Sequence, residues 1–419
     1  MTLADQTATA DPATADPTAA TAILAVPASR GTCPFDPPPA YERAREEEPA
    51  APVRLWDGSI TWMLTRHQDI RAVLGDRRFS ADANRPGFPF LSAGRRALAT
   101  MNASFIRMDD PEHARLRRML TGDFIVKRAE ALRPRIRAIA EDLLAAMTQG
   151  RSGERAGHAD LVREFALPLP SLVICLLLGV PYEDHAYFQQ RSSTILSNTA
   201  GLDEVRTARA DLNAYIKQLT EAKRRRDEDD DILSRLIRHD DLTDDEIAAM
   251  GMLLLVAGHE TTANMTALSV LALLRDPVQL GRLRADPTLI RGAVEELLRY
   301  LTIVHTGVAR VATEDVEIAG RTIRAGEGVL CMINAANRDE RVFPGAGVLD
   351  VGRDARRHLA FGFGVHQCLG QPLARTELQV ALEVLLEGLP NLGLAVPFEE
   401  IPFRHDMLVY GVRSLPVAW

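Results

Sequence analysis

The chain has 419 residues, of which 46% are hydrophobic and 25% are charged, a composition typical of a globular protein with one large or two smaller domains. Its net charge of −8 and its pI near 5.8 argue against a nucleic-acid-binding protein. The longest apolar stretches, residues 167–181 and 250–258, are shorter than the ~20 residues that a membrane-spanning helix needs. We therefore expect a cytoplasmic protein without membrane insertion.

The four cysteines are far apart in the sequence and form no Cys-x-x-Cys pair, which disfavours a zinc site and a disulfide framework. A reducing compartment fits this usage. Three of them, Cys33, Cys175 and Cys331, we interpret as small apolar residues of the core.

Residues 1–32 are rich in Ala, Thr, Pro and Asp and lack the basic segment of a secretory signal, so we expect a disordered leader. The remaining residues, 33–419, form the predicted domain. Its first element is a β-hairpin, because apolar runs at 53–55 and 60–64 flank Asp57-Gly58. A short helix at 67–74 follows.

The Pro-, Gly- and Asn-rich composition of residues 82–103 predicts a long loop, and long ordered loops are usually functional.

From residue 110 onward the pattern is mostly helical, with predicted helices at 135–147, 161–178, 184–196 and 202–223. Thr243 and Glu246 form a capping box at the start of a long helix that extends through residue 274. A helix at 289–300, short strands at 308–311 and 316–323, a meander at 337–357 and a helix after residue 370 complete the pattern. We see no linker and no internal repeat, so the fold class is mainly α with small β-sheets.

Residues 361–370, FGFGVHQCLG, place Cys368 in a glycine-rich loop directly before a helix-like run. The dipole and free N–H groups of a helix N-terminus favour a thiolate, which makes Cys368 a candidate metal ligand. The segment resembles the haem-thiolate loop of cytochromes P450, and this resemblance makes haem iron the first hypothesis. Phe361 can shield the sulfur from water. Glycines give the backbone freedom for a flat macrocycle to approach closely, and three lie here: Gly362, Gly364 and Gly370. The alternative is a buried structural cysteine in a tight turn.

Residues 257–262, AGHETT, interrupt the apolar central helix with polar side chains that need hydrogen-bond partners. Ala257 and Gly258 leave room for a ligand on one face. Thr261 can turn its hydroxyl from the helix carbonyls toward that space and open the helix locally, and Glu260 can relay protons. The alternative is a helix kink with hydrogen-bonded threonines.

Two weaker patterns complete the candidate site. Glu296 and Arg299 are three residues apart on one helical face and can therefore pair, as many surface residues do. Several cations could bind carboxylates of a cofactor, although exposure to solvent is their default interpretation: His113, Arg117, Arg310 and His366.

In this order the motifs resemble those of the cytochrome P450 family over about residues 33–419. The cysteine loop fits FGxGxHxCxG at every fixed position, and EELLR supplies the ExxR motif. AGHETT fits the oxygen-activation pattern, with Glu260 where many bacterial members have Asp. The resemblance implies the single-domain cytochrome P450 fold, a triangular prism with a long central helix over the haem.

The resemblance also implies roles for these residues. Cys368 would be the axial ligand of haem b, and Glu260 and Thr261 would deliver protons. Glu296 and Arg299 would form the ion pair that supports the cysteine loop, with Arg353 as a candidate third member. The haem propionates would be held by the four cations named above: His113, Arg117, Arg310 and His366.

As the resemblance implies, the enzyme would be a monooxygenase that inserts one oxygen atom from O₂ into a C–H bond. Electrons from NAD(P)H would arrive through a ferredoxin reductase and a ferredoxin, which could dock near Arg115, Arg118 and Arg375. We expect a monomer. The group of actinobacterial enzymes that it looks like includes hydroxylases of macrolides, vitamin D and drug-like compounds.

The substrate is therefore expected to be a lipophilic small molecule, macrolide, sterol-like or drug-like. An apolar pocket suits it, and nine residues are candidates for its lining: Phe88, Phe90, Leu91, Leu254, Ile303, Val304, Val308, Met407 and Leu408. Two alternatives remain open. One is a nitric-oxide reductase of similar fold, and the other is a non-catalytic haem sensor or carrier.

Overall fold

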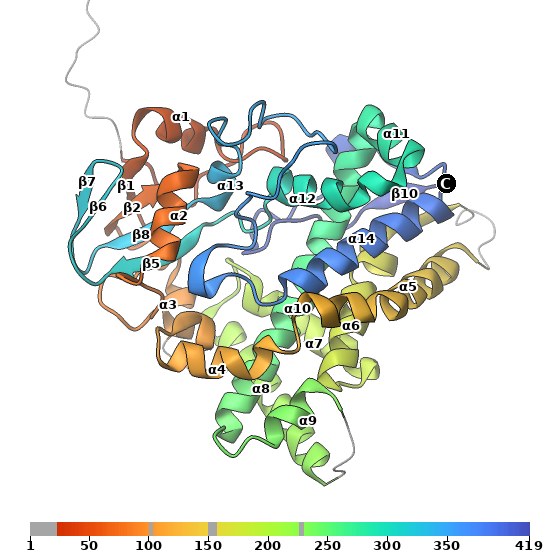
Figure 1. Cartoon of the computed structure of the whole chain (residues 1–419), viewed down its shortest axis with the longest axis horizontal. Helices are drawn as coiled ribbons and strands as arrows, with labels where there is room; N and C mark the ends of the chain where they lie inside the picture. The colour runs from red at the N-terminus through yellow and green to blue at the C-terminus, as the bar shows by residue number, and fades with distance from the viewer. Residues whose placement is uncertain (1–22, 100–103, 150–156, 226–229) are drawn as a thin grey trace, which may run out of the picture.

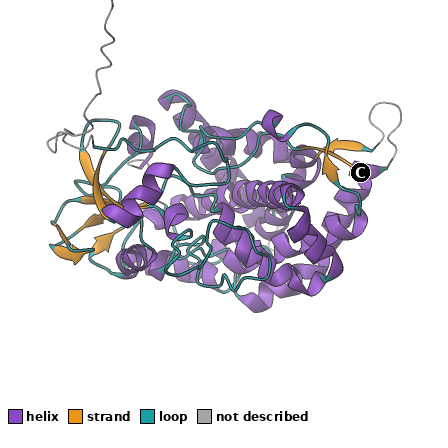
Figure 2. Cartoon of the chain, turned by 90° about the horizontal axis from the view of Figure 1, so that it is seen from above, coloured by secondary structure: helices purple, strands orange, loops and turns teal. Residues whose placement is uncertain are grey.

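A computed structural model of the chain describes residues 23–99, 104–149, 157–225 and 230–419. Most of these residues are helical, and the strands gather in small sheets at the ends of the molecule (Figure 2). The prediction of a mainly α fold with small β-sheets is confirmed. No helix among the residues described is long and apolar enough to cross a membrane.

The largest sheet holds five strands in the order β1-β2-β8-β5-β3, and β2 pairs with β8 in parallel while the other pairs are antiparallel. The predicted hairpin is confirmed, since β1 and β2 pair around Asp57-Gly58 and Gly58 has a φ of 83°. The strands are β1 (Ala50–Arg54), β2 (Ile60–Leu64), β3 (Phe79–Ser80), β5 (Val308–Ala312) and β8 (Gly328–Cys331).

Two smaller sheets complete the β-structure. The strand predicted at 316–323 is a hairpin of β6 (Val316–Ile318) and β7 (Arg321–Ile323), because the chain turns at Ala319 and Gly320 with positive φ. Near the C-terminus, β10 (Pro416–Ala418) pairs with both β4 (His158–Asp160) and β9 (Gly393–Leu394).

The helices agree with most of the predictions, with ends that differ by a few residues, except that the helix predicted from residue 135 begins at Val126. The principal ones are α1 (Pro39–Glu47), α2 (His67–Gly75), α4 (Glu112–Thr121), α5 (Val126–Thr148), α6 (Pro168–Leu178), α7 (His185–Leu196), α8 (Leu202–Arg224), α9 (Ile232–Ile237), α10 (Asp244–Arg275), α11 (Pro277–Ala285), α12 (Ile290–Leu301), α13 (Ile333–Ala336) and α14 (Gln371–Gly388).

Two predictions of local structure are wrong, and several helices, among them α1, α9, α11 and α13, were not predicted. The loop predicted at 82–103 contains a helix, α3 (Ala93–Ala99), and residues 100–103 lie outside the described part. The helix predicted at 161–178 begins with a π-helical turn, Val162–Ala166, and its α-helical part starts only at Pro168. The helix α11 has no predicted counterpart, although Pro277 at its first position is a usual start signal.

The structure describes residues 23–32, which were predicted as part of the leader. Leu24 and Val26 exchange backbone hydrogen bonds with Arg54, of 2.8 and 3.1 Å, and Val26 is buried in a small core with Met63. Residues from 24 onward therefore belong to the folded part, and residues 1–22 lie outside the residues described.

The long helix α10 runs through the centre of the helical part, and α6 and α14 pack against it (Figure 1). Thr243 Oγ1 accepts a hydrogen bond from the backbone N–H of Glu246 at 3.2 Å, and Glu246 Oε2 accepts one from the N–H of Thr243 at 2.8 Å. The capping box is confirmed. From residue 262 to 273 every side chain of the helix is buried, as expected for a helix that is apolar all round.

Candidate functional site

The cysteine loop is folded tightly between α2 and the start of α14. The Cys368 N–H donates to the Phe361 carbonyl at 2.8 Å, and Gly362 and Gly364 have φ values of 72° and 75°. A Cβ on Gly364 would overlap the carbonyl oxygen of Leu74 in α2. Glycine is therefore required at 364 by the backbone conformation and by packing against α2.

Cys368 has accessible surface, yet burial by the surrounding protein raises the pKa of its thiol. Both facts hold for a thiol that lines a cavity. The N–H groups of Gly370 and Gln371 and the charge of Arg117 act in the opposite direction and favour the thiolate.

The buried ion pair predicted from EELLR is formed. Arg299 donates from Nε and Nη2 to the two carboxylate oxygens of Glu296, both at 2.7 Å, and neither side chain is exposed. Arg353, the candidate third member, donates to Glu296 Oε1 at 3.2 Å. Buried charges are stable only when they are paired in this way.

This network reaches the cysteine loop through Asn337. Arg299 Nη1 donates to the Asn337 carbonyl at 2.8 Å, and Asn337 Oδ1 accepts from the Leu359 N–H at 2.7 Å, two residues before Phe361. Asn337 belongs to no pattern in the sequence, so its part in the support of the loop was not predicted.

A second, unpredicted network joins the same helix to the loop. Arg375 Nε donates to Glu295 Oε1 at 2.7 Å, His358 Nε2 lies 3.1 Å from Glu295 Oε2, and the Arg375 guanidinium lies 4.6 Å from the centre of the Phe361 ring. Burial opposes ionisation of Glu295, but the hydrogen bonds from His358 and Arg375 outweigh it and lower its pKa to about 2.

These contacts change the expectation for a basic docking surface. Arg375 is paired with Glu295, and Arg115 is paired with Glu112 at 2.9 Å and with Glu246. Of the three arginines expected to attract a ferredoxin, Arg118 is exposed.

The middle of α10 exposes a narrow strip. Leu253, Ala257 and Thr261 have accessible surface at intervals of four residues, which places them on one face of the helix, and the neighbouring Val256 and Gly258 are also half-buried. Gly258 was expected to leave room for a ligand, but a Cβ there would lie 2.9 Å from Ile174, so α6 fills the space that this glycine leaves.

Thr261 also differs from the expectation. Its Oγ1 donates to the Ala257 carbonyl at 2.7 Å, and α10 continues without a break through this point. The predicted local opening of the helix is therefore wrong. Because the hydroxyl donates its hydrogen bond to the Ala257 carbonyl, the lone pairs of Thr261 Oγ1 remain able to accept another hydrogen bond.

Glu260 is 4% exposed and is held by two residues that sequence reasoning missed. Arg404 Nη1 donates to Glu260 Oε2 at 2.9 Å, and Asn264 Nδ2 lies 3.3 Å from the same oxygen. Arg404 is 144 residues from Glu260 in the sequence and belongs to no motif, so the spacing of residues could not predict this contact.

The predicted cations near the cysteine loop lie partly together. The rings of His113 and His366 are 4.0 Å apart, and His113 Nε2 and His366 Nδ1 are buried without a hydrogen-bond partner. Burial, with a further contribution from the charge of Arg310, lowers the pKa of His366 to about 3. Arg117 donates to the Gln367 carbonyl at 2.6 Å and so contacts the cysteine loop itself.

Arg310 is buried beside a second arginine that was not predicted. Burial, followed by the charge of Arg310, lowers the pKa of Arg107 to about 10. A buried and a half-buried guanidinium group that repel each other, next to unpaired imidazole nitrogens, fit a bound dianion such as the two propionates of a haem. The residues present therefore fit the cofactor that the motifs imply.

The nine predicted pocket residues are only partly brought together. Val304 pairs with Val409, and the Ile303 carbonyl accepts from the Tyr410 N–H at 2.9 Å, so residues 303–304 lie beside the hairpin that carries Met407 and Leu408. Val308 shares an apolar cluster with Val304, and Leu254 belongs to the main core against which Ile303 packs. The other three lie in separate clusters: Phe88 and Phe90 with Val311, and Leu91 with Met63.

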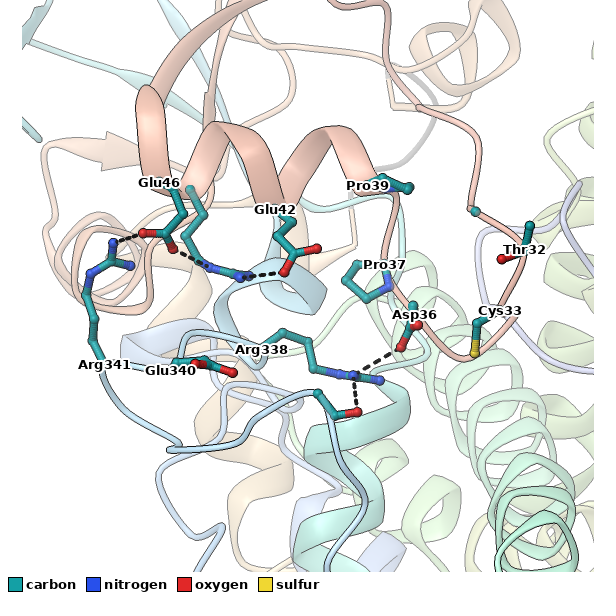
Figure 3. Close-up of a pocket in the computed structure, with 13 residues that line it drawn as sticks. Thr32, Cys33, Asp36, Pro37, Pro39, Glu42, Glu46, Arg338, Glu340 and Arg341 are labelled. Atoms are coloured by element: carbon teal, nitrogen blue, oxygen red, sulfur yellow. Dashed lines mark hydrogen bonds and ion pairs between the residues drawn. The ribbon is translucent and has the colours of Figure 1, made fainter.

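A separate pocket of about 600 Å³ lies between α1 and the meander (Figure 3), and none of the predicted site residues lines it. Its charges are largely paired with one another, as in Arg338 with Asp36 at 3.2 Å and Arg341 with Glu46. The lining residues are Gly31, Thr32, Cys33, Asp36, Pro37, Pro39, Glu42, Arg45, Glu46, Arg338, Glu340, Arg341 and Gly347.

Comparison with known proteins agrees with the geometry. A family model described as Cytochrome P450 matches residues 194–389. Cytochrome P450-SU2 of Streptomyces griseolus is 66% identical over 407 residues, covering 97% of this chain and 100% of the relative. Vitamin D3 dihydroxylase of Streptomyces griseolus is 43% identical and covers 94% of this chain and 97% of the relative.

Among solved structures, the crystal structure of GfsF superposes with a TM-score of 0.87 at 46% identity, covering 94% of this chain and 100% of that one. At this similarity the predicted fold, with its long central helix, is confirmed.

Proposed function

The chain belongs to the cytochrome P450 family, and from that premise we propose that it oxidises a lipophilic small molecule by inserting one oxygen atom into a C–H bond, with electrons from a ferredoxin. Membership of the family makes it a haem-dependent oxidoreductase that uses O₂. The haem supplies the oxidation chemistry when bound, and the protein supplies orientation and protons.

The observation that carries the proposal is the presence of one accessible thiol and one accessible threonine at the two motifs of the family. Cys368 is the accessible cysteine in the glycine-rich loop, and Thr261 is the polar residue on the accessible face of α10. Cys368 Sγ would bind the iron, and a coordinated thiol loses its proton whatever its pKa in the free protein. His113, His366 and Arg310 would hold the propionates.

Proton delivery is assigned to two residues of α10. Thr261 Oγ1, whose proton is engaged by Ala257, can accept a hydrogen bond from a donor in the cavity. Glu260 stands next in the chain as a buried carboxylate that can take a proton from water and pass it on.

The substrate is proposed from the apolar side chains beside the 403–412 hairpin. Ile303, Val304, Met407 and Leu408 are aliphatic residues on adjoining segments, a lining that suits a macrolide, sterol-like or drug-like compound. One relative is named for dihydroxylation of vitamin D3, a compound of that kind. A ferredoxin would find the exposed Arg118 on α4.

The ligand assignment is tested with Cys368→Ala. We expect the variant to lose the red-shifted Soret band of the reduced carbon-monoxide complex, which reports a thiolate on iron, while Cys33→Ala keeps it. A Cys368→Ala protein with the wild-type spectrum would overturn the assignment.

The reaction is tested by a compound library. Compounds that shift the haem spectrum are incubated with ferredoxin, reductase, NAD(P)H and isotopically labelled O₂, and we expect one labelled oxygen atom in the product. Oxidation of NADH driven by nitric oxide without ferredoxin would instead identify a nitric-oxide reductase. Binding without any product would identify a sensor or carrier.

The role of Thr261 is tested with Thr261→Ala. We expect product formed per NAD(P)H to fall at least several-fold and hydrogen peroxide to rise, because the hydroxyl no longer directs protons. Thr266→Ala is a matched control, since Thr266 Oγ1 makes the same kind of bond to the Thr262 carbonyl at 2.9 Å but is buried. Equal coupling in the two variants would contradict the role.

A further inference from the structure

We propose that Arg404 is a positioning residue for Glu260, held in place by the hairpin of residues 403–412. The proposal rests on the proposed function, because it takes Glu260 as the group that passes protons toward the cavity. Nothing in the motifs of the chain points to Arg404, which lies near the C-terminus.

Three side chains contact one another around the carboxylate, and Arg404 Nη2 also lies 3.5 Å from Ser193 Oγ. Arg404 Nη1 lies 2.9 Å from Glu260 Oε2 and 3.2 Å from Asn264 Oδ1, and Asn264 Nδ2 lies 3.3 Å from Glu260 Oε2. Asn264 Nδ2 also donates to the Glu260 carbonyl at 2.7 Å, which fixes the amide on the helix. The positions of these three groups therefore depend on one another.

The ion pair lies in a largely buried place. The Arg404 and Glu260 side chains are 13% and 5% exposed. A carboxylate in such a place loses most of its hydration, so a cation and a second hydrogen bond are needed to keep it charged and oriented. Arg404 supplies the cation, and Asn264 supplies the second hydrogen bond.

The hairpin brings Arg404 to this position through its backbone. The Arg404 N–H donates to the Gly411 carbonyl at 2.8 Å, and Phe403 pairs with Val412. A Cβ on Gly411 would overlap Asn264 Oδ1, so the hairpin backbone itself rests on the central helix at the residue that holds Glu260. Glycine at 411 makes this approach possible.

Both side-chain contacts go to the same carboxylate oxygen, Oε2. Glu260 Oε1 takes no part in these two contacts. Because Oε2 is held from two sides, the orientation of the carboxylate, and with it the direction of Oε1, is fixed. Arg404 thereby determines which oxygen of Glu260 is turned toward a proton donor or acceptor. This is a positioning role, since Arg404 acts through Glu260.

The experiment uses haem-loaded protein with a ferredoxin and NAD(P)H in air-saturated buffer without substrate, and follows hydrogen peroxide formation and its solvent deuterium isotope effect. We expect Glu260→Gln and Arg404→Gln to change both quantities in the same direction and by similar factors. The double variant should be no worse than either single variant, and Arg404→Lys should recover most of the rate because it keeps the charge.

A matched control comes from the same hairpin. Arg413 is 53% exposed and pairs with Asp406 at 2.6 Å, so Arg413→Gln breaks an arginine–carboxylate pair away from Glu260 and should leave both quantities unchanged. If Arg404→Gln does not load haem, Asn264→Ala takes its place. It removes a hydrogen bond to Oε2 without leaving a charge unpaired, and should shift the isotope effect as Glu260→Gln does.

A second readout does not depend on turnover. In urea unfolding of the haem-loaded proteins, the shifts in midpoint caused by Arg404→Gln and Glu260→Gln should be strongly non-additive, as expected for two groups in contact.

Wild-type peroxide formation and isotope effect in Arg404→Gln or Asn264→Ala, with altered values in Glu260→Gln, would overturn this inference and leave the proposed function intact. Additive losses in the double variant would also overturn it, since they would show a purely structural role. Unchanged values in Glu260→Gln would overturn both this inference and the proton role in the proposed function.

Discussion

Two adjacent carboxylates on α12 support the cysteine loop from different sides. Successive residues on a helix point about 100° apart, so Glu295 and Glu296 can serve separate partners. Glu296 is bound by Arg299, which reaches the loop through Asn337, whereas Glu295 is bound by Arg375 and His358. The position of Cys368 therefore depends on two buried sets of charges and not on its own loop alone.

The charge of Glu295 makes a prediction about acid stability. Its pKa is lowered from 4.5 to about 2, so the group stabilises the fold above pH 4.5 and loses that contribution as the pH falls toward 2. The loss amounts to roughly 1.4 kcal/mol per pH unit in this window. We expect Glu295→Gln to be less stable at neutral pH and to lose stability less steeply below pH 4.5.

The measurement is the urea midpoint of the haem-loaded protein, taken once at near-neutral pH and once at about one pH unit below pH 4.5. Glu340→Gln, which changes an exposed carboxylate, serves as the control and should follow the wild type. Parallel acid losses in wild type and Glu295→Gln would show that this carboxylate does not contribute.

At the scale of elements, the glycines of α10 set how closely its neighbours approach. A Cβ on Gly258 would lie 2.9 Å from Ile174 of α6, and one on Gly251 would lie 3.0 Å from both Ile216 of α8 and Leu233 of α9. Small residues at these crossings let apolar helices pack against the central helix on several sides. The accessible strip of Leu253, Ala257 and Thr261 is consequently confined to the face of α10 that these helices do not cover.

This packing predicts opposite outcomes for two Gly→Ala substitutions. In a helix, alanine is usually more stable than glycine by about 0.5–1 kcal/mol. Gly281→Ala in α11 meets open space and should show that gain. Gly258→Ala should instead destabilise the fold, because overpacking at a crossing costs about 1–3 kcal/mol. The urea unfolding midpoints of the two variants test this prediction. A higher midpoint than the wild type in both variants would disprove the close crossing of α6 and α10 at Gly258.

Sequence reasoning succeeded where the contact is local. The Thr243 capping box, the Glu296–Arg299 pair and the glycine-rich approach to Cys368 involve residues a few positions apart, so their spacing carries the signal. The hydrogen bond of Thr261 to Ala257 is local too, but a sequence cannot say which of two acceptors a hydroxyl chooses.

Contacts between distant segments could not be predicted. Arg404 on Glu260, Arg375 on Glu295 and Arg117 on the Gln367 carbonyl join residues 80 to 250 positions apart. Each depends on how the helices and the C-terminal hairpin come together, and an isolated arginine in the sequence reads as a surface residue by default. The packing of Ile174 of α6 on Gly258 of α10 could not be predicted for the same reason.

At the scale of the whole molecule, segments far apart in the sequence contribute the polar groups of the proposed haem site. His113 Nε2 on α4 and His366 Nδ1 in the cysteine loop are buried without a partner, the buried Arg310 is on β5, and the accessible strip is on α10. A protein that folds with such groups unpaired gains stability when a ligand satisfies them. The cofactor of this family is therefore part of the packing as well as of the chemistry.

Removal of the haem should loosen these segments selectively. A ligand that binds only the folded state, present at about a thousand times its Kd, stabilises that state by roughly 4 kcal/mol. We expect the haem-free protein to unfold at lower urea and to exchange amide hydrogens faster at residues 113–117, 257–261, 308–312 and 361–370, because these segments lose their contacts. The helix α11 (Pro277–Ala285) carries none of the site residues and should keep its exchange rates. A uniform increase along the chain, α11 included, would show that these segments do not share one ligand.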